Sequence, residues 1–206
     1  MFVKQLGSRC QIKSSFPIIS LTFSRNRISR ASFTMSSVSL YDFTVPVAIK
    51  QLESLRAVLK KAEQWCKDNG KPESTITEGR LAPDMLPLTF QVQAACNMSA
   101  KCIQRLEAGD VPFIEDNEKT FAELDARIAK NLEILKAVKP EALQGKESAK
   151  VEFKAGPAEL KFTGLSYVQQ FLLPNLFFHT TTAYAIVRAA GVTVGKFDFL
   201  GAPIGQ

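Results

Sequence analysis

A single histidine, His179, limits the acid–base chemistry that this chain can perform near neutral pH. It is the only imidazole in 206 residues, and histidine is the side chain whose unperturbed pKa lies in that range. It stands in the most distinctive stretch of the sequence, LPNLFFHTTTAY, residues 173–184. One imidazole argues against metal centres built from several histidines, so the sequence predicts no metal and no cofactor.

Asn175 precedes His179 by one helical turn, and side chains four residues apart project from the same face of a helix. Two interpretations stay open. His179 can be a neutral core histidine bonded to Asn175 or to the carbonyl of Gln170. Alternatively, it can be a general base or ligand anchor in a pocket, with Asn175 orienting it. On the second interpretation, Gln91 and Tyr184 are further candidate ligand-binding residues.

Glu78, Arg80 and Asp84 form a second candidate constellation, in the stretch TEGRLAPDM, residues 77–85. Charges at the mouth of a helical bundle can bind a polar substrate, which makes Arg80 and Asp84 candidate ligand-binding residues. The alternative is structural. Asp84 would begin a helix and interact favourably with its dipole, while Arg80 would pair with a carboxylate at the surface.

Several common site patterns do not occur in the chain, which contains no GxSxG, GxGxxG, HExxH or phosphate-binding glycine loop. The four cysteines show neither a CxxC pair nor metal-ligand spacing. Three of them, Cys66, Cys96 and Cys102, fall in helical patterns, which is typical of small buried thiols. This cysteine usage favours an intracellular, reduced protein.

The net charge of +6 arises from the first 34 residues. That segment holds six of the 26 basic residues and none of the 20 acidic ones, so the remainder is electrically neutral. A neutral body lacks the basic surface that binds a phosphate backbone, and we therefore expect no nucleic-acid partner. No apolar run is long enough to span a bilayer, so no membrane partner is expected either.

Residues 1–34 form a basic leader, rich in arginine and serine, and two interpretations stay open for it. Its composition is typical of a mitochondrial transit peptide, which would direct the protein to the matrix. Met35, followed by two serines, can equally be the natural start, which would leave the protein in the cytoplasm. Residues 35–206 are expected to form a single domain.

Four segments carry the apolar periodicity of helices. They are residues 45–67, residues 84–108, a third that opens with a capping box at Thr120 and ends before Pro140, and residues 166–190. Between the third and fourth, apolar and polar residues alternate on either side of Gly156-Pro157, which predicts a β-hairpin. The pattern predicts an all-α fold, a four-helix bundle with a small hairpin between its third and fourth helices.

Pro174 interrupts the fourth helical pattern. It has no N–H to donate, and its ring clashes with the carbonyl of Gln170, so the helix should kink or restart there. This places the expected distortion within about one and a half turns of His179. A pocket at the kink is therefore the place where we would expect His179 to meet a ligand.

Three stretches together resemble a known family: RLAPDM at residues 80–85, the run at residues 173–184, and GKFDFLG at residues 195–201. The family is an uncharacterised domain-of-unknown-function family of bacteria and fungi, related to the DinB/YfiT-like four-helix bundles. The resemblance covers residues 40–201 and implies bundle topology and frequent homodimers. Members of related branches are thiol-dependent transferases or isomerases.

The superfamily often carries a metal site of three histidines, one on the second helix and an HxxxH pair on the last. If His179 matches the second histidine of that pair, Asn175 stands in the first position and Gln91 near the position on the second helix. Asn, Gln and His make a poor set for Zn²⁺ or Ni²⁺. The resemblance therefore implies a bundle whose metal chemistry has been lost.

Two functional hypotheses follow. The first is a metal-free module that binds a small organic ligand or serves a structural role. The second is a metal-independent small-molecule enzyme, of transferase or isomerase type, that uses His179 in a pocket at the Pro174 kink. The second predicts a cavity touching His179, Asn175 and Gln91, and a filled core at that place would contradict it.

Overall fold

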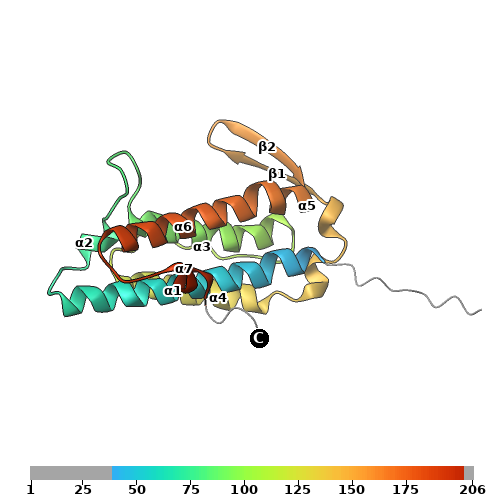
Figure 1. Ribbon diagram of the computed structural model, residues 1–206. Coiled ribbons are helices and arrows are strands. Elements are labelled where there is room, and N and C mark those ends of the chain that lie inside the picture. Colours follow the sequence, from blue (N-terminus) through green and yellow to red (C-terminus); the bar gives the residue numbers. More distant parts are fainter. Residues whose placement is uncertain (1–38, 202–206) are drawn as a thin grey trace, which may run out of the picture. The chain divides into compact units, whose positions relative to one another are not determined.

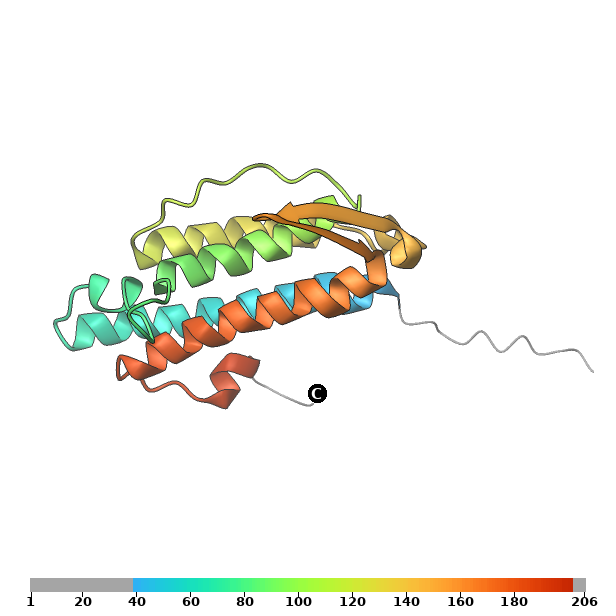
Figure 2. The same cartoon turned by 90° about the horizontal axis from the view of Figure 1, so that it is seen from above.

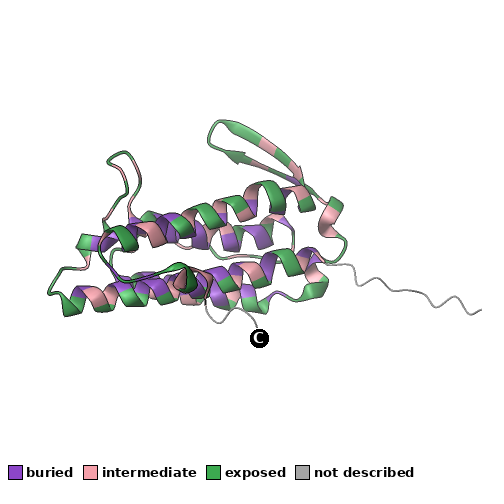
Figure 3. Cartoon of the chain, viewed as in Figure 1, coloured by how far each residue is buried: buried purple, intermediate pink, exposed green. Residues whose placement is uncertain are grey.

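Four long helices dominate the computed structural model, which describes residues 39–201. They are α1 (Leu40–Asp68), α3 (Leu88–Arg105), α4 (Phe121–Ala137) and α6 (Leu173–Ala189). Helices α1 and α3 each pack against both α4 and α6, and the four run side by side in two perpendicular views (Figures 1 and 2). Their buried residues face one another across the core (Figure 3). The expected mostly helical fold is confirmed, and the predicted leader, residues 1–34, lies outside the described residues.

Helix α1 begins five residues earlier than the periodicity predicted. Ser39 is its N-cap and forms a reciprocal capping box with Asp42, whose carboxylate accepts from the backbone N–H of Ser39 at 2.9 Å. Thr44, just before the predicted start, lies inside the helix and donates to the carbonyl of Leu40. Pro46 is likewise an internal residue of the helix.

Helix α3 begins at Leu88, so the predicted start at Asp84 is wrong. Pro87 explains the difference, because a proline disfavours helical backbone at the residue before it, and Leu86 lies outside the helix. Asp84 consequently occupies an exposed turn. The short helix α2 (Ser74–Thr77) precedes this turn.

Helix α3 also ends earlier than predicted, at Arg105 instead of Ala108. Glu107 adopts a left-handed backbone with φ of 53°. Its N–H donates to the carbonyl of Gln104, and the N–H of Ala108 donates to that of Ile103 at 2.8 Å. These two bonds close a Schellman motif, so Glu107 terminates the helix before Gly109 is reached.

Helix α4 begins at the predicted capping box. The Thr120 hydroxyl accepts from the N–H of Glu123 at 3.2 Å, and the Glu123 carboxylate accepts from the N–H of Thr120 at 2.9 Å. Two short 3₁₀ turns follow the helix, Pro140–Leu143 and Lys146–Ser148. They lead into the predicted hairpin, which is confirmed: β1 (Lys150–Ala155) pairs antiparallel with β2 (Ala158–Thr163).

The hairpin is attached to the helices through an aromatic cluster. Phe153 and Phe162 lie about 6 Å apart, between ring centroids, and both contact Tyr167 and Phe171 beyond β2. The Arg105 guanidinium lies 3.6 Å from the centroid of the Phe153 ring, a cation–π contact. Burial raises the pKa of the Tyr167 phenol to about 12, so this buried ring stays neutral.

After the hairpin, the chain leads into α6 through α5 (Gly164–Tyr167) and a π-helical turn, Val168–Leu172. The N–H of Leu173 donates to the carbonyl of Val168, five residues back, and α6 then continues regularly. The interruption expected at Pro174 is therefore present as a π-helical turn, which admits a residue without an N–H at low cost.

A short helix, α7 (Lys196–Leu200), packs against α1. It contains most of the GKFDFLG motif. Asp198 accepts from the N–H of Gly195 at 2.7 Å and pairs with Lys61 of α1. Gly201 has φ of 65°, and a Cβ there would lie 2.4 Å from the Ser54 hydroxyl, so the motif ends where only glycine fits.

No helix among residues 39–201 combines the length and the apolar composition needed to cross a membrane.

Replacing Phe153 by Ala should lower the free energy of unfolding by about 2–3 kcal/mol. The ring is the centre of the aromatic cluster, and its partial exposure keeps the loss below the ~3–5 kcal/mol of a fully buried Phe. Urea denaturation measures the change. The control is Lys154→Ala, an exposed position on the same strand, which should leave the stability unchanged. An equal loss in both variants would show that the cluster does not anchor the hairpin.

Candidate functional site

A chain of two hydrogen bonds holds His179. Its Nδ1 lies 2.9 Å from Oε1 of Gln91, on the neighbouring helix α3. The Gln91 amide nitrogen donates to the carbonyl of Leu86 at 3.0 Å. This second bond orients the amide so that its oxygen faces the ring. His179 therefore carries its proton on Nδ1 and donates to Gln91, and its Nε2 is the unprotonated nitrogen.

Aromatic rings surround the other edges of His179. Phe90 and Phe178 meet it edge to face, at 6.0 and 5.2 Å between ring centroids. Burial of the half-exposed imidazole lowers its pKa below the ordinary value. The ring is therefore neutral at pH 7. Nε2 makes no hydrogen bond among the described residues and is not sealed from solvent.

Asn175 does not orient His179, so that expectation is wrong. Its amide nitrogen donates to the carbonyl of Phe171 at 2.6 Å, on its own helix. The π-helical turn and Pro174 disturb the regular ladder at this point, and an asparagine side chain readily bonds to a nearby carbonyl. The expected partners of His179, Asn175 and the Gln170 carbonyl, are replaced by Gln91.

The remaining candidate ligand-binding residues lie apart from this chain of bonds. Arg80 is exposed, and its guanidinium donates to the carbonyl of Met85 at 2.6 Å, which closes the loop containing Asp84. Asp84 itself is exposed. The Tyr184 hydroxyl donates weakly to the carbonyl of Val194 at 3.4 Å, and its ring contacts Phe199 of α7. Arg80 and Tyr184 therefore hold loops in place, and the three residues do not converge on a common cavity.

The donor set does not fit the three-histidine metal site that the resemblance implies. The Asn175 amide is bonded to its own helix, and Gln91 is bonded to Leu86 and to His179. Amide oxygens are poor ligands for Zn²⁺ or Ni²⁺, so Nε2 of His179 is the one suitable donor of the three side chains, and one nitrogen cannot build a tetrahedral site. Among residues 39–201, no group of three or more His, Cys, Asp and Glu side chains lies close enough to hold an ion.

Five surface cavities of about 270–410 Å³ occur in the described part of the chain, and none of the five is lined by His179, Asn175 or Gln91. One of them lies between α3, α4 and the segment that connects them, residues 107–119, which we call the strap. The pocket expected at the Pro174 kink is therefore not among these cavities.

Arg127 of α4 organises the wall of that cavity, and the sequence analysis missed it. Its side chain is 1% exposed and donates to the Glu118 carboxylate at 2.7 Å, to Asp116, and to the backbone carbonyl of Glu115 at 2.9 Å. A further bond reaches Asn97 of α3 at 2.9 Å. A single buried guanidinium thus joins α3, α4 and the strap. The acidic run of residues 115–118, together with an arginine beside an apolar stripe, was the sequence signal for it.

The three cysteines within residues 39–201 lie in the packed helices. Cys66, Cys96 and Cys102 are free and buried. Burial raises the pKa of Cys96 and of Cys102 to about 12, so both are thiols rather than reactive thiolates at pH 7.

Arg127→Met should lower the free energy of unfolding by about 3–5 kcal/mol, because it leaves the nearly buried carboxylate of Glu118 without its counter-charge. Guanidinium denaturation gives the value. Lys136→Met, which removes an exposed ion pair with Glu53, is the control and should cost less than about 1 kcal/mol. A loss in Arg127→Met no larger than in the control would mean that the network does not stabilise the fold.

Stability should fall on acidification from the ordinary histidine pKa, about 6.5, down to the lowered pKa of folded His179. In that window the unfolded chain binds a proton that the folded chain does not, so the free energy of unfolding decreases with falling pH. Because there is one histidine, its imidazole C–H resonances report the folded pKa directly by NMR. His179→Gln should flatten the slope of stability between pH 7.5 and about 6. A folded pKa above the ordinary value would contradict the burial argument.

The comparisons with known proteins agree with the fold and with the family suggested by the three motifs. The model of a family described as a domain of unknown function (DUF1993) matches residues 40–200. Among solved structures, the chain is similar to a DinB family member protein from Shewanella denitrificans, with 35% sequence identity and a TM-score of 0.72 over 81% of this chain and 94% of that chain. No curated protein matches the chain. This chain therefore belongs to the DUF1993 family, and its fold is DinB-like.

Proposed function

We propose that this protein is a non-catalytic module that binds a small organic ligand without a metal. Its four long helices would then serve as a DinB-like four-helix bundle, with the hairpin inserted between the third and fourth. The observation that carries the proposal is the chain of bonds from His179 through Gln91 to Leu86. It uses the sole imidazole to connect α6, α3 and the loop before α3.

The surroundings of His179 support a structural role. Its described side-chain contacts are an amide and two phenyl rings, and no carboxylate is bonded to Nδ1 to stabilise an imidazolium, as catalytic histidines commonly require. Burial lowers the pKa of the ring. A base with a lowered pKa and no charged partner accepts a proton less readily from a substrate.

The ligand-binding part of the proposal is supported by the strap and the cavity beneath it. Residues 107–119 run outside the packed helices and leave a surface cavity of about 270 Å³ against α3 and α4. Ligand sites of helical bundles are commonly built between their helices.

One observation favours a second candidate, a metal-independent enzyme. Nε2 of His179 is unbonded and reached by solvent, between two partly exposed phenyl rings. A substrate that docked on these rings would meet an acceptor nitrogen. The two candidates predict different effects of removing the imidazole. The first predicts a loss of stability, and the second predicts a loss of turnover.

The first experiment compares full-length protein with the His179→Ala variant by elemental analysis and by native mass spectrometry. We expect no stoichiometric metal in either protein. We also expect the same small non-covalent adduct in both, because the proposed ligand does not require the imidazole. The variant should lose about 1–3 kcal/mol of stability, since Gln91 is then left with an unpaired buried oxygen.

A stoichiometric metal that disappears in His179→Ala would overturn the proposal. An adduct that disappears in the variant, without any metal, would favour the second candidate. His179→Gln serves as the matched control, because its amide can still donate to Gln91.

A further inference from the structure

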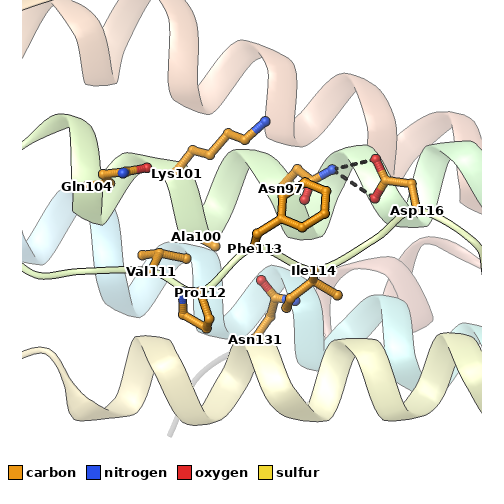
Figure 4. A pocket seen from close by; sticks show the side chains of 10 residues that line it. All are labelled: Asn97, Ala100, Lys101, Gln104, Val111, Pro112, Phe113, Ile114, Asp116 and Asn131. Carbon is orange, nitrogen blue, oxygen red and sulfur yellow. Dashed lines mark hydrogen bonds between the residues drawn. The ribbon is translucent and has the colours of Figure 1, made fainter.

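The cavity beneath the strap has a volume of about 270 Å³. An apolar cavity of about 150 Å³ suffices to bind one benzene molecule, so this one has room for a compact bicyclic molecule. Figure 4 shows it between α3 above, α4 below and the strap crossing in front. Much of its wall is apolar and comes from Ala100, Val111, Pro112 and Ile114.

Asn131 supplies an unsatisfied hydrogen-bond acceptor at the base of this cavity. Its side chain is 1% exposed, and the amide nitrogen donates to the carbonyl of Arg127 at 3.0 Å. That bond fixes the orientation of the amide. Its oxygen has no partner among the described residues, and the amide rises from α4 toward the strap (Figure 4). A buried acceptor without a donor is rare and costly. A ligand that supplies a hydrogen-bond donor to this oxygen would therefore gain binding free energy.

The charged residues that line the cavity do not favour a charged ligand. Asp116 is already paired with Arg127 and accepts from Asn97 at 3.1 Å. Lys101 is exposed at the rim. The buried part of the cavity therefore presents one neutral acceptor within apolar surface.

The strap offers a route into the cavity. Its far end is pinned, because Arg127 binds Glu115, Asp116 and Glu118. Residues 110–114 make no backbone hydrogen bond within the described structure, and Phe113 stands 91% exposed above them. Lifting this stretch breaks few interactions, so a molecule can enter without unpacking the helices.

We propose that this cavity binds a small, neutral, largely apolar molecule that carries one N–H or O–H group, and that this group donates to Oδ1 of Asn131. The inference rests on the proposed ligand-binding function and adds to it the site and the chemical class of the ligand. It separates the ligand site from His179, which lines none of the five cavities.

The test uses two probes of nearly equal shape, indole and benzofuran, titrated into the full-length protein by ligand-observed NMR. Indole carries an N–H donor where benzofuran carries an oxygen. Indole should bind at least about tenfold more tightly, because only indole satisfies the Asn131 oxygen. In Asn131→Leu, which removes the acceptor and keeps the size, this preference should vanish.

A second variant keeps the test valid if Asn131→Leu does not fold. Ala100→Met fills the cavity from the α3 wall and leaves Asn131 in place, and it should abolish binding of both probes. Its matched control is Ala122→Met, which adds the same side chain in the separate cavity between α1 and α4 and should leave indole binding unchanged.

Equal binding of the two probes, or indole binding that survives both Asn131→Leu and Ala100→Met, would overturn the assignment of the site while leaving the ligand-binding function standing. Binding of neither probe at millimolar concentration would also overturn it, since the cavity would then hold only water. The proposed function fails separately, on the adduct and metal measurements with the His179 variants.

Discussion

The burial of one guanidinium constrains this structure more than any other charge. Arg127 lies almost wholly out of water and is compensated by Glu118, Asp116, the Glu115 carbonyl and Asn97. A buried charge is tolerated when counter-charges and hydrogen-bond acceptors compensate it. Both terminal nitrogens of the guanidinium are bonded in this way, while its Nε has no partner among the described residues. The partners come from α3 and the strap, so satisfying Arg127 obliges the strap to lie across both helices. The cavity beneath the strap is a consequence of that constraint.

Two polar sites among the helices differ in how their buried groups are paired. Nδ1 of His179 and the Gln91 amide are matched donor to acceptor and end on the Leu86 carbonyl, and the unbonded Nε2 is open to solvent. Asn131 is matched on one side only, its oxygen is buried without a partner, and the residue lines the cavity beneath the strap. A closed network specifies a packing arrangement, whereas an open one leaves a group for something else to bind. This contrast, rather than the rarity of histidine, separates the structural polar residues from the proposed ligand site.

The membership in the DUF1993 family and the absence of fit to a three-histidine metal site are compatible. The fold of a DinB relative is kept over most of the chain, while the amides of Gln91 and Asn175 take hydrogen bonds that are internal to the helices. Function resides in the side chains placed on a fold rather than in the fold itself. A bundle can therefore retain its packing while its chemistry changes.

Local sequence patterns predict the helical segments, the hairpin and the interruption at Pro174, because apolar periodicity, capping boxes and proline act over a few neighbouring residues. Thr120 and Glu123 show this, since their box is local and was predicted correctly. The two ends of α3 were predicted less well. Pro87 moves its start to Leu88, after the predicted Asp84, and Glu107 ends it before Gly109. The site was decided by tertiary structure. His179 bonds to a residue 88 positions away, and Arg127 reaches across the strap, because a buried polar group takes whichever partner the packed helices bring within reach. No local pattern encodes that partner, so Asn175 was the reasonable expectation and Gln91 the outcome.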